Sequence, residues 1–319
     1  MLQMRPRIFV SSLQSGRCVW QVRRSLSISA PTQAAGSVKQ LGVIGAGQMG
    51  LGIAFVAALV SKVPVVLVDS SEASINKSVG FLDKLLQKDV AKGKYSQAEA
   101  NQVKSRIDPT TKFDSIFTAD FIIEAVPEIT ALKCEIFAKL AAGARSDTIL
   151  STNTSSISIT KIAAAAKGAE ERVVCTHFMN PVPVQKGVEI ISGLQTTSET
   201  LDRAVEFVKT MGKIPSVSAD SPGFIANRLL IPYINEAIIC LETGVGTKED
   251  IDNMMKNGCA MPMGPLALAD FIGLDTCLAI MNVLHTETGD SKYRPSGLLQ
   301  KMVDAGWLGV KSKKGFYNY

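Results

Sequence analysis

Short apolar runs alternate with longer amphipathic stretches over the first two thirds of the chain. From about residue 38 to residue 219, runs rich in β-branched residues are separated by charged or alanine-rich stretches. This alternation predicts a parallel β-sheet whose strands are connected by crossover helices. The runs predicted as strands are KQLGVIG, VPVVLVD, FIIEAV, TILSTN, RVVCTH and VEIIS.

The pattern changes at SADSPG, where the strand-like runs give way to helical periodicity. Apolar residues then recur every three or four positions in FIANRLLIPYINEAIICLE, KEDIDNMMKN, PLALADFI and TCLAIMNVL. We therefore predict an α/β domain over residues 38–219 and a smaller all-α domain over residues 220–319. The boundary is expected near Ser218 to Pro222.

One stretch of the α/β domain, residues 72–107, is charged and amphipathic. It is too long for a single crossover helix, and AKGKYS interrupts it. The interruption favours two helices over one. We interpret the stretch as a helical hairpin that projects from the domain as an arm.

The N-terminal segment has an unusual charge pattern. The first 68 residues contain no Asp or Glu. Residues 1–30 include five arginines among serines and apolar residues: Arg5, Arg7, Arg17, Arg23 and Arg24. This composition is typical of a mitochondrial transit peptide, which we predict over residues 1–37, and the alternative is a disordered basic tail. Without these arginines the formal net charge falls from +5 to 0 (5 − 5), so nucleic-acid binding has no electrostatic support.

Composition limits the other classes of protein. At 319 residues and 46% hydrophobic content, the chain is long enough for about two domains with a sizeable core. The two histidines, His177 and His285, are too few for a histidine-rich metal site, and the six cysteines show no metal-binding spacing, so we predict no metal. No apolar run approaches the roughly 18 to 20 residues that cross a bilayer.

A glycine-rich turn follows the first predicted strand. It reads LGVIGAGQMG and leads into the helical run LGIAFVAALV. Gly45 permits a tight turn, Gly47 lets the backbone approach a pyrophosphate, and Gly50 allows close packing of the helix on the sheet. The helix begins near Gln48 and Met49 and offers its first N–H groups to the phosphates. The alternative for this turn is an ordinary loop between strand and helix.

Asp69 strengthens the case for a dinucleotide. It ends the second predicted strand 19 residues beyond Gly50, where a carboxylate accepts hydrogen bonds from ribose hydroxyls. No Arg or Lys follows it in DSSEAS, and the carboxylate repels a 2′-phosphate, so NAD is favoured over NADP. The alternative for Asp69 is a turn residue that caps the strand. Together these features predict a Rossmann-type domain with NAD as its cofactor.

A single carboxylate stands inside an apolar run in THFMNPVPVQKGVEI. Burial of an ionised Glu189 is costly unless another group pairs with it. The Asn and the prolines between residues 180 and 183 allow the chain to fold back, which makes His177 a candidate partner. The alternative is that His177 has a backbone partner and Glu189 pairs with a Lys or Arg. From these residues alone the two interpretations are equally supported.

Four motifs in a fixed order connect the chain to a known family. After the glycine turn come STNTSSISIT, HFMNPVPVQKGVEI and SPGFIANRLL. From about Lys39 to Tyr319 the chain resembles the L-3-hydroxyacyl-CoA dehydrogenases of fatty-acid β-oxidation, in particular their short-chain members, the 3-hydroxybutyryl-CoA dehydrogenases. The resemblance implies an NAD-dependent oxidoreductase that interconverts L-3-hydroxyacyl-CoA and 3-ketoacyl-CoA. With the N-terminal segment it implies the mitochondrial matrix, and the apolar helical domain favours a homodimer formed through that domain.

The family's catalytic residues fall on four positions of this chain. By resemblance, His177 takes the proton from the 3-hydroxyl of the substrate, while Glu189 orients the imidazole ring and stabilises its charged form. Ser155 and Asn227 match the residues that contact the substrate oxygen. The alternatives are a helix cap for Ser155 and an ordinary polar residue on an early helix turn for Asn227.

Further positions match residues that bind the cofactor or coenzyme A. The resemblance implies cofactor contacts from Glu128, Lys133, Ser155, Asn180 and Lys311. The alternatives are a turn-forming role for the asparagine and a solvated surface for the charged residues. The predicted arm corresponds to the family's coenzyme A-binding segment. Lys84 and Lys88 share one helical face there, although a solvated face is the favoured interpretation.

The chain departs from the family pattern at Met179, Gln185 and Gly187, where aromatic or larger apolar residues are usual. These departures bear on the shape of the acyl pocket more than on the chemistry. Two other functions compete with the one that the resemblance implies. One is a dehydrogenase of a free 3-hydroxy acid, and the other is an NAD-binding protein without catalysis, against which the spacing of His177 and Glu189 argues.

Overall fold

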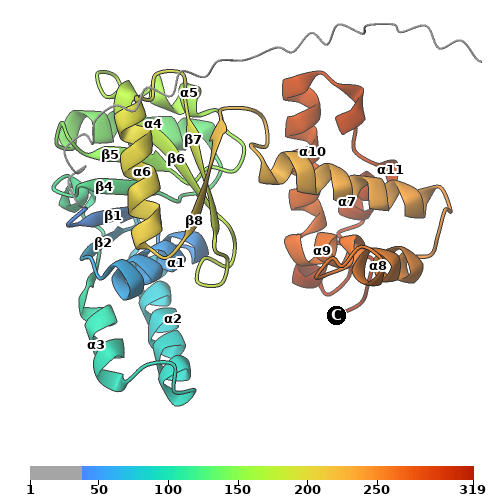
Figure 1. The fold of residues 1–319 in the computed structure, drawn as a ribbon, viewed down its shortest axis with the longest axis horizontal. Coiled ribbons are helices and arrows are strands. Elements are labelled where there is room, and N and C mark those ends of the chain that lie inside the picture. Colours follow the sequence, from blue (N-terminus) through green and yellow to red (C-terminus); the bar gives the residue numbers. More distant parts are fainter. Residues whose placement is uncertain (1–37) are drawn as a thin grey trace, which may run out of the picture. The chain divides into compact units, whose positions relative to one another are not determined.

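A computed structural model describes residues 38–319 of the chain. The segment predicted as a transit peptide lies outside these described residues. Figure 1 shows a domain built around a β-sheet, followed along the chain by helices alone. The predicted fold class, a Rossmann-type α/β domain followed by an all-α domain, is confirmed.

Eight short strands form a single sheet in the first domain. In chain order they are β1 (Leu41–Ile44), β2 (Val65–Val68), β3 (Ile107–Thr110), β4 (Phe121–Glu124), β5 (Ile149–Thr152), β6 (Val173–Phe178), β7 (Gly187–Ser192) and β8 (Ile214–Ala219). Across the sheet the order is β3-β2-β1-β4-β5-β6-β7-β8, so β1 lies between β2 and β4. The strand order reverses at β1, and open α/β sheets bind their ligands at the carboxyl ends of the strands beside such a reversal.

The last two strands break the parallel pattern that the sequence predicted. Neighbouring strands from β3 across to β6 are parallel, whereas β6 and β7 are antiparallel and β8 is parallel to β7. The connection from β6 to β7 spans residues 179–186, which is shorter than the dozen or so residues that a parallel crossover needs. The parallel arrangement therefore ends at β6, and the chain folds back between residues 179 and 186, as the Asn and the prolines of that segment had suggested.

Two edge strands were not predicted from the sequence. β3 reads IDPT, and only Ile107 in it is buried. β8 reads IPSVSA, and all of its residues are exposed or partly exposed. An edge strand has one neighbour and buries few side chains, so it lacks the continuous apolar run by which the central strands were recognised.

Helices cover both faces of the sheet (Figure 1). They are α1 (Gln48–Val56), α2 (Glu72–Ala91), α3 (Gln97–Ser105), α4 (Thr130–Gly143), α5 (Ile159–Ala163) and α6 (Ser198–Thr210), with short helical turns at η1 (Ala57–Ser61), η2 (Phe113–Ile116) and η3 (Glu170–Arg172). Buried residues of α1, α2, α3 and α6 join one face of the sheet in a hydrophobic cluster, and those of α4 and α5 join the other face in a second cluster. The central strands are apolar because they are buried on both sides.

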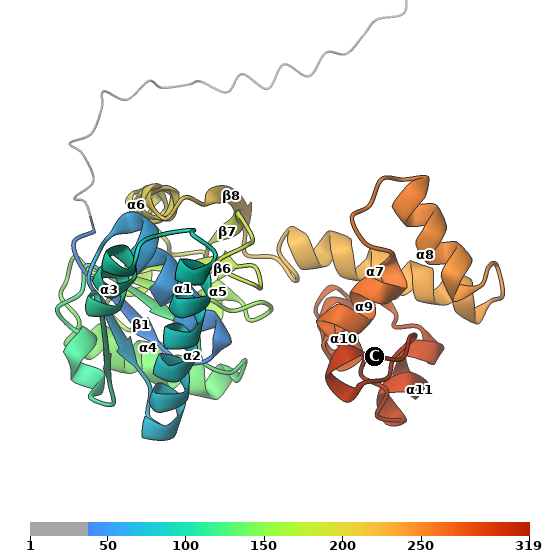
Figure 2. The same cartoon turned by 90° about the horizontal axis from the view of Figure 1, so that it is seen from below.

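The stretch predicted as an arm contains α2 and α3, which extend away from the sheet in Figure 1 and lie in front of it in the view from below in Figure 2. Ile75 and Leu82 lie on the buried face of α2. α3 begins with a capping box, in which the hydroxyl of Ser96 accepts a hydrogen bond from the N–H of Glu99 and the Glu99 carboxylate accepts one from the N–H of Ser96. The helical part ends earlier than predicted, because Ile107 already belongs to β3.

The second domain is entirely helical. Its helices are α7 (Ala226–Glu242), α8 (Lys248–Asn257), α9 (Pro265–Ile272), α10 (Leu274–Thr288) and α11 (Gly297–Asp304), with short turns at η4 (Ser291–Tyr293) and η5 (Val310–Ser312). α11 was not predicted, since it is short and buries only Leu299 and Met302. Within residues 38–319 no single helix has the length and apolarity of a membrane span, and the bent pair α9 and α10, at 96°, meets those criteria only when taken together.

The end of the chain is held to this helical domain by a buried carboxylate. Asp270, in α9, accepts hydrogen bonds from the N–H groups of Phe316 and Tyr317, both at 2.9 Å. It also accepts one from the hydroxyl of Tyr319, at 3.1 Å. Asp270 therefore satisfies three donors of the closing segment GVKSKKGFYNY. Lys248 adds a hydrogen bond to the carbonyl oxygen of Phe316, and Asp252 accepts one from the hydroxyl of Tyr317.

Candidate active site

The glycine-rich turn between β1 and α1 has the geometry that a pyrophosphate site requires. Gly45 has a φ of +101°, and a Cβ at this position would lie 2.7 Å from the carbonyl oxygen of Ala125. A Cβ at Gly50 would lie 1.8 Å from the carbonyl oxygen of Gly45. Gly47 is exposed at the N-cap of α1, and a Cβ there would contact nothing within 4 Å. Packing therefore requires glycine at positions 45 and 50, whereas Gly47 leaves open space in front of the first N–H groups of α1.

Asp69 links the end of β2 to this turn. Its Oδ2 accepts a hydrogen bond from the N–H of Ala46 at 2.8 Å, and its Oδ1 accepts one from the N–H of Ser71 at 2.9 Å. The side chain therefore has the turn-holding role that was the alternative interpretation. Each carboxylate oxygen accepts more than one hydrogen bond, so this role leaves capacity for ribose hydroxyls. Ribose binding by Asp69 stays a prediction.

His177 and Glu189 lie opposite each other in the antiparallel pair β6 and β7. Their side chains meet with His177 Nδ1 2.8 Å from Glu189 Oε2, and both are almost completely buried. The other oxygen of Glu189 accepts hydrogen bonds from the N–H groups of Ile225, at 2.7 Å, and Ala226, at 2.9 Å. The partner of Glu189 among the described residues is therefore the histidine and not a Lys or Arg.

The ionisation of Glu189 follows from these contacts. Burial disfavours the charged carboxylate, but the hydrogen bond from His177 and those from two backbone N–H groups outweigh it and hold the pKa of Glu189 below its ordinary value. An ionised Glu189 accepts the proton of His177 Nδ1–H, which leaves Nε2 without a proton in the neutral ring. Nε2 is therefore the nitrogen that is able to accept a proton.

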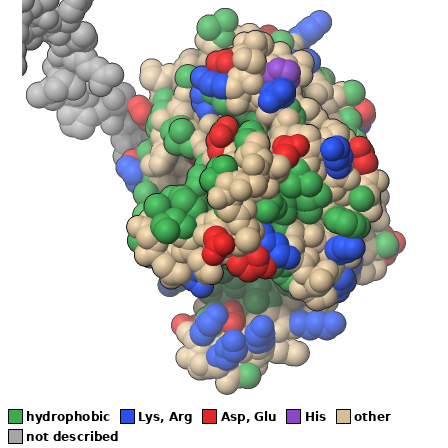
Figure 3. Space-filling view, turned by 90° about the vertical axis from the view of Figure 1, so that its right-hand side faces the viewer, with side chains coloured by type: hydrophobic (Ala, Val, Ile, Leu, Met, Phe, Trp, Pro, Cys, Tyr) green, Lys and Arg blue, Asp and Glu red, His purple; other side chains and the backbone are tan. Residues whose placement is uncertain are grey.

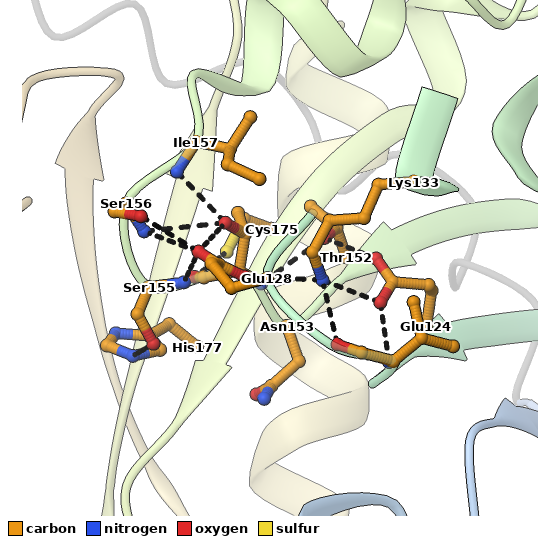
Figure 4. Close-up of polar contacts among 12 residues, drawn as sticks. Glu124, Glu128, Lys133, Thr152, Asn153, Ser155, Ser156, Ile157, Cys175 and His177 are labelled. Carbon is orange, nitrogen blue, oxygen red and sulfur yellow. Dashed lines mark hydrogen bonds and ion pairs between the residues drawn. The ribbon is translucent and has the colours of Figure 1, made fainter. Parts of the chain in front are cut away.

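Ser155 and Asn227 complete a chain of hydrogen bonds with this pair. Ser155 follows β5, and its Oγ lies 3.0 Å from His177 Nε2 (Figure 4). Because Nε2 is the acceptor, the serine hydroxyl donates. Asn227, in the first turn of α7, donates from Nδ2 to the carbonyl oxygen of Ser155 at 3.3 Å. The structure thus brings together all four residues that the sequence singled out as catalytic.

Glu128 and Lys133 lie beside this group but differ in exposure. Lys133 is only 1% exposed, so the interpretation of a solvated surface residue is wrong for it. Its Nζ donates to Glu124 at 2.7 Å and lies 3.4 Å from Glu128 (Figure 4). Glu124 was not among the residues predicted from the sequence. It carries the signal that identified Glu189, a carboxylate inside an apolar run, in this case FIIEAV.

The other predicted cofactor contacts are distributed over both domains. Asn180 lies at the glycine turn, where its Oδ1 accepts a hydrogen bond from Gln48 Nε2 at 3.0 Å. Met49 is partly buried and packs against the core of the first domain. Lys311 is ion-paired with Asp275 inside the helical domain. Contact of these side chains with the cofactor stays a prediction.

A groove of about 1030 Å³ runs from the glycine turn along α2. Its walls include Gly47, Asn180 and the two arm lysines, Lys84 and Lys88, together with apolar side chains of α1, α2 and the β6–β7 connection. Figure 3 shows Lys and Arg side chains gathered at the lower edge of the molecule, where the arm lies. This surface suits a long ligand that is partly apolar and partly anionic. No cluster of His, Cys, Asp or Glu residues suited to a metal ion occurs within residues 38–319.

Both domains of the chain match one protein family. Residues 40–221 match the 3-hydroxyacyl-CoA dehydrogenase, NAD binding domain, and residues 223–319 match the 3-hydroxyacyl-CoA dehydrogenase, C-terminal domain. A 3-hydroxybutyryl-CoA dehydrogenase of Bradyrhizobium diazoefficiens is 48% identical over 282 residues, which cover 88% of this chain and 96% of that protein. The mitochondrial hydroxyacyl-coenzyme A dehydrogenase of Sus scrofa is 40% identical over 310 residues, which cover 94% of this chain and 98% of that protein.

A solved structure agrees with these matches. The crystal structure of (S)-3-hydroxybutyryl-CoA dehydrogenase from Ralstonia eutropha aligns with a TM-score of 0.86 and 44% identity. The alignment covers 89% of this chain and 99% of that one. The likeness therefore extends over both domains.

Proposed function

Because the chain belongs to the 3-hydroxyacyl-CoA dehydrogenase family, an NAD-dependent family of oxidoreductases, we propose that it interconverts short-chain L-3-hydroxyacyl-CoA, such as 3-hydroxybutyryl-CoA, and the corresponding 3-ketoacyl-CoA. The observation that carries the proposal is the hydrogen-bonded chain from Glu189 through His177 to Ser155. In this chain, His177 Nε2 is able to accept a proton, and the carboxylate of Glu189 stabilises the imidazolium that forms.

The residues of the chain have distinct parts in the reaction. NAD, when bound at the glycine turn, supplies the acceptor for the hydride. His177 Nε2 takes the proton of the substrate's 3-hydroxyl, and ionised Glu189 stabilises the imidazolium that results. Ser155 Oγ lies 3.0 Å from Nε2, and Asn227 Nδ2 lies 3.3 Å from the carbonyl oxygen of Ser155. When the substrate hydroxyl replaces Ser155 as the donor to Nε2, the serine hydroxyl and the amide of Asn227 donate hydrogen bonds to the substrate oxygen, which orients the reacting carbon.

The groove along α2 supports a coenzyme A thioester as substrate. It begins at Gly47 and passes Lys84 and Lys88, so it offers an anionic nucleotide a place along the arm. Positive charges along a groove attract phosphate groups at close range. The short acyl chain is proposed from the names of the relatives, two of which are 3-hydroxybutyryl-CoA dehydrogenases.

We further propose that the protein acts in the mitochondrial matrix as a homodimer. The Sus scrofa relative is named as mitochondrial, and the arginine-rich composition of residues 1–37 supports a transit peptide. Exposed apolar side chains on the helical domain, including Leu229, Val245 and Phe271, support a partner surface there. Residues 1–30 fused to a reporter should carry it into mitochondria, and light scattering should give the mass of a dimer. A cytosolic reporter or a monomer mass would contradict the respective proposal.

Oxidation of NADH with acetoacetyl-CoA tests the reaction directly. Turnover should be fastest with this substrate and should decline with longer 3-ketoacyl-CoA thioesters. Free acetoacetate is the matched control, because it lacks only the coenzyme A part. Turnover of the free acid at a comparable kcat/KM would favour a free-acid dehydrogenase, and NADH binding without any turnover would favour a non-catalytic protein.

A further inference from the structure

A buried acidic residue lies beside the candidate active site, at the carboxyl ends of β4 and β5 (Figure 4). Glu124 is the last residue of β4 and is fully buried. Its Oε1 accepts hydrogen bonds from the N–H of Val126 and from Lys133 Nζ, both at 2.7 Å, and its Oε2 accepts one from the hydroxyl of Thr152 at 2.8 Å. Both oxygens of the carboxylate are thus engaged within the protein.

The ammonium group of Lys133 lies among three oxygen atoms of the chain. It donates to Glu124 at 2.7 Å and to the carbonyl oxygen of Val126 at 3.3 Å, and it forms an ion pair with Glu128 at 3.4 Å. Lys133 therefore links Glu124 to Glu128. Its contact with the cofactor stays a prediction.

Glu128 connects Lys133 to the turn formed by residues 154–156. Its Oε1 accepts hydrogen bonds from the N–H of Ser155 at 2.9 Å and from Ser156 through both its N–H, at 2.9 Å, and its hydroxyl, at 3.0 Å. The hydroxyl of Thr154 donates to the same oxygen. Its Oε2 is the oxygen that faces Lys133. Oε2 of Glu128 is thus paired with the ammonium group of Lys133, while Oε1 accepts the hydrogen bonds of residues 154–156.

We propose that Glu124 is a positioning residue for the reaction: through Lys133 and Glu128 it holds the turn that presents the hydroxyl of Ser155 to His177. The N–H of Ser155 is tied to Glu128 and its carbonyl to Asn227, and these two anchors direct Oγ to within 3.0 Å of His177 Nε2. The inference rests on the proposed function and adds to it a residue that does not itself contact the substrate or the cofactor.

Glu124→Gln keeps the shape of the side chain and removes its charge. Lys133 then has Glu128 as its only anionic partner, and the ammonium shifts toward it. The hydrogen bonds from Glu128 to the 154–156 turn weaken in consequence, and Ser155 Oγ loses its alignment with the ring. A displacement of this kind, remote from the reacting atoms, is expected to lower kcat about tenfold.

The imidazole of His177 reports this change without any need for turnover. The chain has only two histidines, so ring-nitrogen NMR signals of His177 are read against those of His285 in the same sample. In Glu124→Gln the Nε2 signal of His177 should move toward its position in Ser155→Ala, and His285 should stay unchanged. Adding Glu124→Gln to Ser155→Ala should then change neither the signal nor kcat further, because the two act through one hydrogen bond.

Asp252→Asn is the matched control. Asp252 is also a buried carboxylate, and it accepts hydrogen bonds from the N–H groups of Leu266 and Ala267 at the start of α9. This variant should lower the melting temperature and leave the His177 signal in place. If Glu124→Gln behaves in the same way, Glu124 only stabilises the core and the proposal is overturned.

A second variant covers the case in which Glu124→Gln does not fold. Thr152→Val removes one donor to Glu124 Oε2, and with it the acceptor of the Thr154 N–H at 3.2 Å. It should move the His177 signal in the same direction by a smaller amount, and an unmoved signal would overturn the proposal. Absence of acetoacetyl-CoA turnover in the unmodified protein would overturn the proposed function instead, while the NMR comparison would still decide on Glu124.

Discussion

Glu189 in the candidate active site and Asp270 in the helical domain are two buried carboxylates with similar surroundings. Their exposed fractions are 5% and 1%. Glu189 accepts hydrogen bonds from the His177 ring and from two backbone N–H groups. Asp270 accepts them from two backbone N–H groups and the hydroxyl of Tyr319. Their pKa values nevertheless move in opposite directions, since that of Glu189 is lowered and that of Asp270 is raised.

The difference lies in the charge that the partners carry. Burial disfavours the ionised form at both positions. At Glu189 the imidazole is able to become positive and so compensates for burial. Asp270 has neutral donors only, and the negative charge of nearby Asp252 further raises its pKa. Equal numbers of hydrogen bonds therefore do not give equal ionisation, and a carboxylate that must stay charged for catalysis needs a partner that can become a cation.

The largest expected effect is the loss of turnover in Glu189→Gln. The amide keeps the size of the side chain but no longer fixes the tautomer of His177 or stabilises its protonated form. We expect kcat to fall by roughly 10² to 10⁴, as in other histidine–carboxylate pairs, and NADH affinity to remain almost unchanged. His177→Gln should lose a similar amount, and the double variant should be little worse than the worse single one.

Asp270→Asn is the control for this prediction, because it makes the same chemical change at the other carboxylate. Its kcat should stay within about twofold of the unmodified protein, as for most substitutions away from a site. Near-normal turnover of Glu189→Gln, together with a much lower melting temperature, would make Glu189 a structural ion-pair partner and would remove the contrast between the two carboxylates.

Asp270→Ala should give the opposite result to Glu189→Gln, a loss of stability without a loss of turnover. It leaves the N–H groups of Phe316 and Tyr317 and the hydroxyl of Tyr319 without their acceptor. Since an unsatisfied buried donor costs about 1 to 3 kcal/mol and the closing segment can partly relax, the free energy of unfolding should fall by roughly 2 to 4 kcal/mol. Urea denaturation measures this change. A stable variant with impaired kcat would refute the structural assignment.

A third carboxylate, Asp69, offers a smaller test in the cofactor region. Asp69→Ala should weaken NAD binding by roughly 1 to 3 kcal/mol, the range for hydrogen bonds to a charged acceptor, and should reduce the discrimination against NADP. Part of this loss comes from the turn itself, because Asp69 also holds the N–H of Ala46. Titration with both cofactors measures the effect. A preference of the unmodified protein for NADPH would show that this role of Asp69 is wrong.

The smallest effect is expected in the pH dependence of stability, where the two buried carboxylates should act in opposite directions. The pKa of Asp270 is raised above 3.8, so its contribution to the free energy of unfolding is full below that pH and falls as pH rises through the folded pKa. The pKa of Glu189 is lowered below 4.5, so its contribution is present above that pH and is lost as pH falls through the folded pKa.

Urea unfolding of the unmodified protein, Glu189→Gln and Asp270→Asn at several pH values between about 3.5 and 7 separates the two contributions. As pH falls, the stability advantage of the unmodified protein should shrink relative to Glu189→Gln and grow relative to Asp270→Asn. If both differences changed in the same direction, the opposite ionisation of the two groups would be wrong.

The sequence alone was enough to predict the features of this protein whose local pattern has a single physical cause. The central strands are recognisable because a strand buried on both faces needs a continuous apolar run. The glycine turn is recognisable because side chains at Gly45 and Gly50 would collide with the backbone. Glu189 was expected to have a partner because a carboxylate inside an apolar run is costly to bury alone, and His177 was among the candidates; its catalytic role was implied by the family resemblance.

Only the tertiary structure decided which partner each group has. The antiparallel register of β6 and β7 places Glu189 opposite His177, and the edge strands β3 and β8 are strands only because a neighbour pairs with them. Asp270 takes its three donors from residues 46 to 49 positions away in the chain. Period and composition are properties of neighbouring residues, whereas burial, hydrogen-bond partners and the direction of a pKa shift depend on which distant residues meet in space.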